Sequence, residues 1–194
     1  MYWFQRKLDY VVLPPKLSKN IFQLNEKEAA NYFAWFIENV PGRVAYVSKI
    51  CATELGVPLE KMTCTPESLI LLWRWFRRRA KIEVTGNSQK QLTMETEYIL
   101  RDIGMYLGET FRKNNPNIYW TYYTKPARDF FVNHPLLKGF VEKSMGKRFE
   151  ACFEPIHMAG VQATKIIDKS SRDTDLFAIY NLWAQKIESE NSIP

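Results

Sequence analysis

Basic side chains recur at helical spacing in one short stretch of the sequence. Four of them occupy positions i, i+3, i+4 and i+7 and would form one stripe on a helix: Arg74, Arg77, Arg78 and Lys81. Trp75 and Arg79 lie on the flanks of this basic stripe, and interleaved arginine and aromatic residues suit phosphate contact combined with base stacking. We therefore predict that the stripe, together with Trp75, binds an acidic protein or a nucleic acid. Because cations near a helix C-terminus also suit the helix dipole, a solvated structural face is the simpler alternative.

Cysteine and histidine are the other residue types here that could do chemistry. Cys152 with a histidine could form a nucleophile and its base, and Cys152 with His157 could contribute to a zinc site. Neither His134 nor His157 has a second ligand at helical or hairpin spacing, and the local motifs of serine hydrolases, zinc proteases and P-loop proteins do not occur. We therefore predict no catalytic residue, no metal ligand and no cofactor.

Three carboxylates recur every seven residues in a predicted helix at about residues 92–113: Glu95, Asp102 and Glu109. Paired carboxylates could bind a metal ion or divide the acid and base steps of a reaction. A seven-residue spacing separates neighbours by about 10 Å along a helix axis, which is too far for one small catalytic centre. We therefore interpret these carboxylates as a solvated helix face.

Gly104 and Gly108 lie in the same predicted helix, four residues apart, so they stack on one face and let another backbone approach closely. A dinucleotide-binding loop would need its glycines between a strand and a helix. Each glycine costs about 1 kcal/mol relative to alanine in a helix interior. We therefore predict close packing on an aromatic sheet, with a ligand or partner over the notch as the alternative.

Hydrophobic periodicity predicts the helices of the N-terminal part. One helix is expected at about residues 26–39 and a second from Pro41 to Gly56, because proline favours the first turn of a helix and glycine its end. The connection between them is short, so they should pack as a helical hairpin. Residues 65–67 start a third helix, which carries the basic stripe. The loop at residues 84–88 ends this helical part and is the best internal boundary.

The hydrophobic period changes from near four to two after residues 114–117, which stop the long helix. Four strands are predicted, at residues 118–124, 129–132, 136–141 and 148–153. They should form a small antiparallel sheet whose aromatic residues pack against helices. Pro155 opens a helix to about Ile167, and Asp173 caps the final helix.

The N-terminal residues are predicted to be extended. Pro14 and Pro15 make residues 13–20 a linker, because proline restricts itself and its predecessor to non-helical conformations. The first eleven residues add a strand or lie over the core, and they lack the pattern of a signal peptide. The apolar run Leu69–Trp73 is too short to span a bilayer. We expect no membrane partner.

Composition and charge describe a folded chain of 194 residues, 46% hydrophobic and 14% aromatic, with a net charge of +6. This charge weakly favours anionic partners. The three cysteines form no CxxC pair and leave an odd number, which indicates reduced thiols. We therefore expect a soluble cytoplasmic protein.

The C-terminal half resembles a known type of protein. The resemblance rests on the segments IGMYLGETFRKNNPNIYWTYYTKP, DFFVNHPLLKGF, FEPIHMAGVQATKI and TDLFAIYNLWAQKI. The chain resembles small, uncharacterised bacterial α+β proteins, some of which are similar to immunity proteins encoded beside polymorphic toxins. The shared motifs are structural: a YLGE helix, an aromatic strand and a helix started by proline. The resemblance implies tight binding to a cognate toxin, and it carries no binding residue over to this chain.

Together these patterns predict a single α+β domain over residues 1–194. A helical part at about residues 21–84 packs with a part at about residues 88–190 that holds a helix, a small antiparallel sheet and further helices. We expect a non-enzymatic protein-binding role, with immunity to a bacterial toxin as its most specific form. Nucleic-acid binding through the basic stripe is the alternative, and an enzyme with an unrecognised site is the third.

Overall fold

One continuous helix of 30 residues, α1 (Glu26–Leu55), fills the stretch where two helices are predicted. The computed structural model describes residues 8–17, 19–144 and 147–187, and in it the expected hairpin broken at Pro41 is absent from this stretch, so that prediction is wrong. A proline inside a helix costs about 3 kcal/mol. However, Phe36 and Val44 are buried on either side of Pro41, and burying such a side chain contributes roughly 1.5–3 kcal/mol. Continuous burial of one face therefore outweighs the proline.

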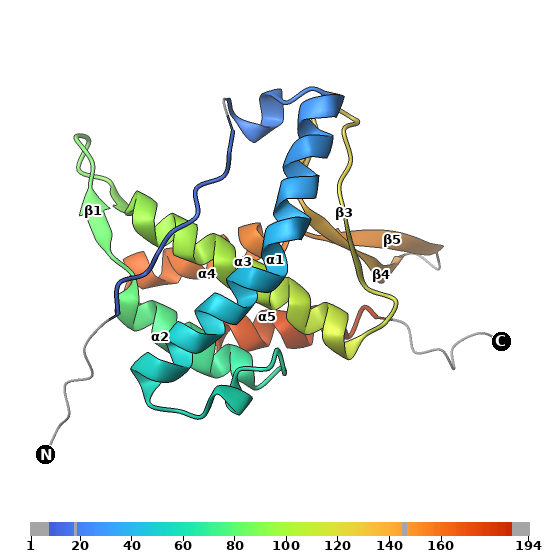
Figure 1. Cartoon of the computed structure of the whole chain (residues 1–194). Coiled ribbons are helices and arrows are strands. Elements are labelled where there is room, and N and C mark those ends of the chain that lie inside the picture. The colour runs from blue at the N-terminus through green and yellow to red at the C-terminus, as the bar shows by residue number, and fades with distance from the viewer. Residues whose placement is uncertain (1–7, 18, 145–146, 188–194) are drawn as a thin grey trace, which may run out of the picture.

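The helix α3 (Met94–Asn114) lies at the centre of the described fold and contacts α1, α2 (Ser68–Arg79), α4 (Pro155–Ile167) and α5 (Asp175–Ala184). Two short 3-10 turns, η1 (Ile21–Gln23) and η2 (Leu59–Lys61), precede α1 and α2 in the sequence. The helices predicted at the stretches of α2, α3, α4 and α5 are confirmed. In Figure 1, α1 crosses α3, while α2 and α5 lie on the lower side of the molecule. The apolar stripe of α3 is buried against the other helices: Ile99, Ile103, Leu107 and Phe111.

Gly104 and Gly108 of α3 mark close approaches of other elements. A Cβ atom at Gly104 would lie 2.6 Å from the Cα of Ile156, in the first turn of α4. A Cβ atom at Gly108 would overlap the indole ring of Trp120. The prediction of close packing is therefore confirmed. Only Gly108 packs on the aromatic strand, because the site beside Gly104 is taken by α4.

Two small antiparallel sheets complete the described fold, so the predicted α+β class is confirmed. The first is a hairpin of β1 (Ile82–Val84) and β2 (Lys90–Leu92), and the second has the order β3 (Tyr119–Thr121), β4 (Leu136–Ser144) and β5 (Lys147–Phe153). The predicted loop at residues 84–88 thus joins two strands that the sequence pattern did not indicate. The strand predicted at residues 129–132 is wrong, because Asp129 accepts a hydrogen bond from the Phe131 N–H and closes a turn there.

One hydrophobic core draws residues from both predicted parts of the chain, from Phe36 on α1 to Tyr180 on α5. Residues 8–11 lie over this core as extended chain, as one alternative predicts. Residues 1–7 of that prediction, and residues 188–190 of the predicted second part, lie outside the described residues. No helix within the described ranges has the length and apolar character needed to cross a membrane.

Candidate binding surfaces

The basic stripe on α2 is partly neutralised by one carboxylate from a distant part of the chain. Arg74 donates from Nε to Oδ2 of Asp173 at 2.7 Å, and Arg77 donates from Nη1 to the other carboxylate oxygen. Burial alone would raise the pKa of Asp173, but its hydrogen bonds with the two arginines outweigh burial and hold that pKa below its usual range. The prediction that Asp173 caps the final helix is wrong, because Thr174 occupies the cap position.

A hollow of about 420 Å³ opens between the stripe and the turn before α5. We call it the arginine hollow, and its polar lining consists of Arg74, Arg77, Arg78, Lys169, Ser171 and Asp173. A second hollow of about 670 Å³ shares Lys169 and is also lined by Lys90 and Asp168. The structure therefore brings the first three arginines of the stripe together and adds cations from two other segments.

Two residues of the predicted surface do not belong to this hollow. Trp75 is only 2% exposed, and its Nε1 donates to Oε2 of Glu54 at 2.7 Å inside the core. Base stacking on Trp75 is therefore excluded, which corrects the predicted role of that ring. Lys81 follows the end of α2 and pairs with Glu95 at 2.7 Å. The flanking Arg79 is buried and pairs with Glu54 at 2.5 Å.

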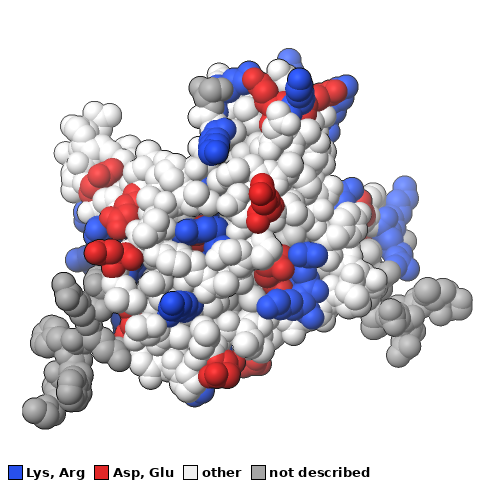
Figure 2. Space-filling view, viewed as in Figure 1, with Lys and Arg blue, Asp and Glu red and all other residues white. Residues whose placement is uncertain are grey.

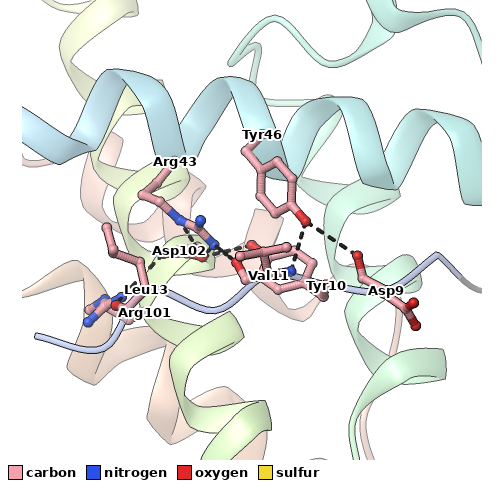
Figure 3. A network of polar contacts seen from close by, with 8 residues as sticks. All are labelled: Asp9, Tyr10, Val11, Leu13, Arg43, Tyr46, Arg101 and Asp102. Atoms are coloured by element: carbon pink, nitrogen blue, oxygen red, sulfur yellow. Dashed lines mark hydrogen bonds and ion pairs between the residues drawn. The ribbon is translucent and has the colours of Figure 1, made fainter.

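A second set of charged residues lies inside the molecule, between the N-terminal segment, α1 and α3 (Figure 3). We call it the Asp102 cluster, and it consists of Tyr10, Arg43, Arg101 and Asp102. Asp102 is 0% exposed, accepts a hydrogen bond from the Tyr10 hydroxyl at 2.7 Å and pairs with Arg43 at 2.5 Å. The interpretation of Asp102 as part of a solvated face is therefore wrong. Its partners Tyr10 and Arg43 lie far away in the sequence, so the seven-residue spacing carries no sign of them.

The arginines of the Asp102 cluster also hold the main chain of the N-terminal segment. Arg43 donates to the Val11 carbonyl at 2.9 Å, and Arg101 donates to the Leu13 carbonyl. Burial lowers the pKa of Arg101, whereas burial and the neighbouring Asp102 raise the pKa of Tyr10 far above its ordinary value. With its charged groups used in these internal contacts, the cluster positions the N-terminal segment.

A partly exposed group of rings forms the third candidate surface. We call it the aromatic patch, and it consists of Phe22, Phe130, Phe131, His134 and His157. The ring of Phe130 lies 5.1 Å from those of both Phe131 and His157, and Phe22 lies 5.2 Å from His134. Phe130 is 59% exposed and Phe22 is 44% exposed. The sequence analysis missed this surface, because its residues come from η1, a turn and α4.

Two buried polar side chains hold the aromatic patch in place. Asn133 donates from Nδ2 to the carbonyls of Ile21 and Leu24, at 2.9 and 3.1 Å, which fixes η1 beside the turn. Oε1 of Glu154 lies 3.5 Å from Nδ1 of His134. Its other carboxylate oxygen accepts a hydrogen bond from the main-chain N–H of His157, in the first turn of α4. The patch is therefore a set of two exposed and three half-buried rings on a fixed frame.

Comparison with known proteins does not identify any of these surfaces. No protein-family model, no curated protein and no solved structure matches this chain. The surfaces are therefore distinguished by their own geometry. On the face shown in Figure 2, basic and acidic groups alternate and leave wide uncharged areas between them, so no single strong field covers that face.

The three thiols offer little nucleophilic character. Burial raises the pKa of Cys51 to about 12 and also raises the pKa values of Cys64 and Cys152. Thiols with raised pKa values are protonated at neutral pH, and the thiolate is the reactive form. Among the described residues, no group of three or more histidine, cysteine or acidic residues is placed to hold a metal ion.

Proposed function

We propose that this protein is a non-enzymatic binding protein that docks another protein on the aromatic patch. The observation that carries the proposal is the exposure of Phe130, at 59%, within a contiguous group of rings. Binding energy at protein interfaces concentrates in a few residues, and aromatic residues are enriched in the interface core. A lone exposed phenylalanine would need no explanation, but a group of rings from three segments does.

The fixed frame under the rings supports the same proposal. Asn133 and Glu154 are buried and hold the segments that present Phe22, Phe130 and His157. An interface that is already ordered before binding loses less conformational entropy when the partner arrives. Phenylalanine rings add large contact area with few rotatable bonds. These features favour a tight complex over a transient contact.

The charges beside the patch indicate the chemistry of the partner. Lys125 and Arg128 are exposed in the segment that leads to Phe130, and the whole chain carries a net charge of +6. Lys125 pairs with Glu26 at 3.0 Å. A partner with an apolar centre and an acidic rim complements this surface.

The most specific form of the proposal is immunity to a cognate bacterial toxin, acting in the cytoplasm. The resemblance of the C-terminal half to proteins that are similar to immunity proteins supports it, and the aromatic patch lies mostly in that half. Neutralisation by stoichiometric binding needs a tight, preformed surface. No catalytic step is required.

The experiment compares two exposed phenylalanines. The probe is the product of the neighbouring toxin-like gene in the native host, tested by co-purification, by calorimetry and by rescue of growth. Phe130→Ala should weaken binding by about 30-fold or more, as expected for a residue that contributes at least about 2 kcal/mol. Phe149→Ala is the matched control, because Phe149 is 51% exposed on β5 and makes no ring contact with the patch.

Two results would overturn the proposal. One is equal binding by the Phe130→Ala variant and the unchanged protein. The other is failure of the chain to neutralise any neighbouring gene product, combined with recovery of no partner whose binding depends on Phe130.

A further inference from the structure

The arginine hollow has far more positive than negative charge. Its cations are Arg74, Arg77, Arg78 and Lys169, and the single carboxylate in its lining is Asp173. Arg74, Arg77 and Lys169 alone outnumber this one carboxylate, so the hollow attracts anions beyond the one it already holds. Its residues are separate from the aromatic patch, so this surface is independent of the proposed protein docking.

The two paired arginines keep hydrogen-bonding capacity for a further anion. A guanidinium has five N–H donors, and Asp173 takes Nε of Arg74 and one Nη1 donor of Arg77. Both arginine side chains are half-buried and open to the hollow. Planar guanidinium groups bind phosphate in a bidentate manner, which a lysine cannot do. The chemistry of the hollow therefore suits a phosphate group.

Asp173 occupies the place that a phosphate would take. Its side chain is 33% exposed and uses both oxygens on the two arginines. An ion pair this exposed contributes little to stability, so the carboxylate is readily displaced into water. A phosphate group brings more negative charge and more acceptor oxygens than a carboxylate. Asp173 is thus a weak internal competitor that keeps Arg74 and Arg77 in position.

The lining also indicates which phosphate compound would bind. None of the described residues that line the hollow is aromatic, and Trp73 and Trp75 of the same helix are buried in the core. Without an exposed ring, the hollow cannot stack a base, which is the usual way of holding a single strand. The adjoining hollow shares Lys169 and adds Lys90 beside the carboxylate of Asp168, so cations continue past one phosphate. These features fit a polymer recognised through its backbone alone.

We infer that the arginine hollow binds the phosphate backbone of a nucleic-acid duplex, without reading its sequence, and that Asp173 is displaced on binding. The contact is made by Arg74, Arg77 and Lys169, and Lys90 extends the basic surface beyond it. This assignment keeps part of the predicted basic stripe, but it replaces Trp75 and Lys81 with Lys169 and Lys90.

The test measures fluorescence anisotropy of a labelled duplex of about 20 base pairs, as DNA and as RNA, at several salt concentrations. The logarithm of affinity should fall with the logarithm of salt with a slope of about −0.9 per neutralised phosphate, or about −3 for the contacts named here. An Arg74→Gln/Arg77→Gln variant should bind about tenfold more weakly or worse and lose about two from this slope. Equal affinity for the DNA and RNA duplexes would show that binding depends on the phosphate backbone that both share. A preference for one duplex would identify the natural ligand.

The Asp173→Asn substitution should change duplex affinity in the opposite direction from the arginine variant. Removal of the competing carboxylate should strengthen duplex binding about threefold or more, because the arginines then face the ligand alone. Lys27→Gln/Lys49→Gln is the charge-matched control, since both lysines are exposed on α1 and do not line the hollow. It should change affinity less than about twofold if local contact, and not net charge, determines binding. Thermal unfolding of each variant checks that the fold is kept.

The inference fails if Asp173→Asn and the arginine variant bind the duplex like the unchanged protein, or if the lysine control loses as much affinity as the arginine variant. Tighter binding of a single strand than of the duplex also overturns it. Binding of polyglutamate that depends on Arg74 and Arg77, with no duplex binding, assigns the hollow to an acidic protein instead. Phe130→Ala should leave duplex binding unchanged, so a failure here is distinct from a failure of protein docking.

Discussion

Two sites in the described part of the chain bring two arginines close to one aspartate, and the sites differ in what the arginines do with their other donors. In the Asp102 cluster, Arg43 and Arg101 also donate to main-chain carbonyls of the N-terminal segment. In the arginine hollow, Arg74 and Arg77 open to a solvent-filled space. Buried arginine–carboxylate pairs therefore fix the position of a chain segment. The half-exposed pair leaves its arginines able to exchange one anion for another.

Breaking the buried pair should have the largest effect. Asp102→Asn removes the only carboxylate of the Asp102 cluster and leaves the buried charges of Arg43 and Arg101 uncompensated. Loss of one partner from a buried pair costs about 3–5 kcal/mol, and urea unfolding measures this loss. Asp173→Asn is the matched surface change and should cost less than about 1 kcal/mol. Equal losses for the two variants would contradict the distinction between the sites.

Glu54 gives the second largest effect, because it clamps the other end of the same N-terminal segment. Its oxygens accept from the Leu8 N–H at 2.7 Å and from Trp75, and it pairs with the buried Arg79. Glu54→Gln should cost about 2–3 kcal/mol, since the hydrogen bonds to a charged group weaken. Amide hydrogen exchange at Leu8 should speed up, while the amide of Val11, which donates to Tyr46, should stay protected. Unchanged exchange at Leu8 would exclude this clamp.

Alkaline pH should weaken the buried site alone. The pKa of Tyr10 is raised above its ordinary value of 10.0, because burial and Asp102 disfavour the phenolate. The unfolded chain therefore loses this proton first, and stability present below pH 10 falls as the pH rises, by about 1.4 kcal/mol per pH unit from this group. Tyr10→Phe should show a shallower fall above pH 10 in urea unfolding. Parallel curves for the two proteins would show that Tyr10 does not contribute.

Acidic pH should weaken the ion pairs of Asp173 with Arg74 and Arg77, with the smallest effect on stability of the changes considered. The pKa of Asp173 lies below its ordinary value of 3.8, so its contribution is present above that value and disappears as the pH falls through the lowered pKa. Solvent screening limits the contribution to less than about 1 kcal/mol. The difference in urea midpoint between the unchanged protein and Asp173→Asn should shrink to nothing on acidification. A difference that persists in strong acid requires another cause.

Local pattern is enough to predict α2, α3, α4 and α5, since apolar spacing and proline starts act within a few residues. It failed where distant residues decide. Pro41 was read as a helix start because nothing nearby shows that both sides of it bury one face. Asp102 was read as solvated because Tyr10 is 92 residues away. The arginines at 74 and 77 were predicted to be functional, but their counter-ion Asp173 and their neighbour Lys169 could not be foreseen from the stripe.

The distance in sequence between Tyr10 and Asp102 also sets an order of events during synthesis. At roughly 5–20 residues per second, a ribosome needs roughly 5–20 s to make the 92 residues that separate them. During this interval Arg43 and Tyr46 of α1 have been synthesised, but Asp102, whose carboxylate completes the cluster, has not. Residues 8–13 are therefore made before α3 but reach their final position only after it.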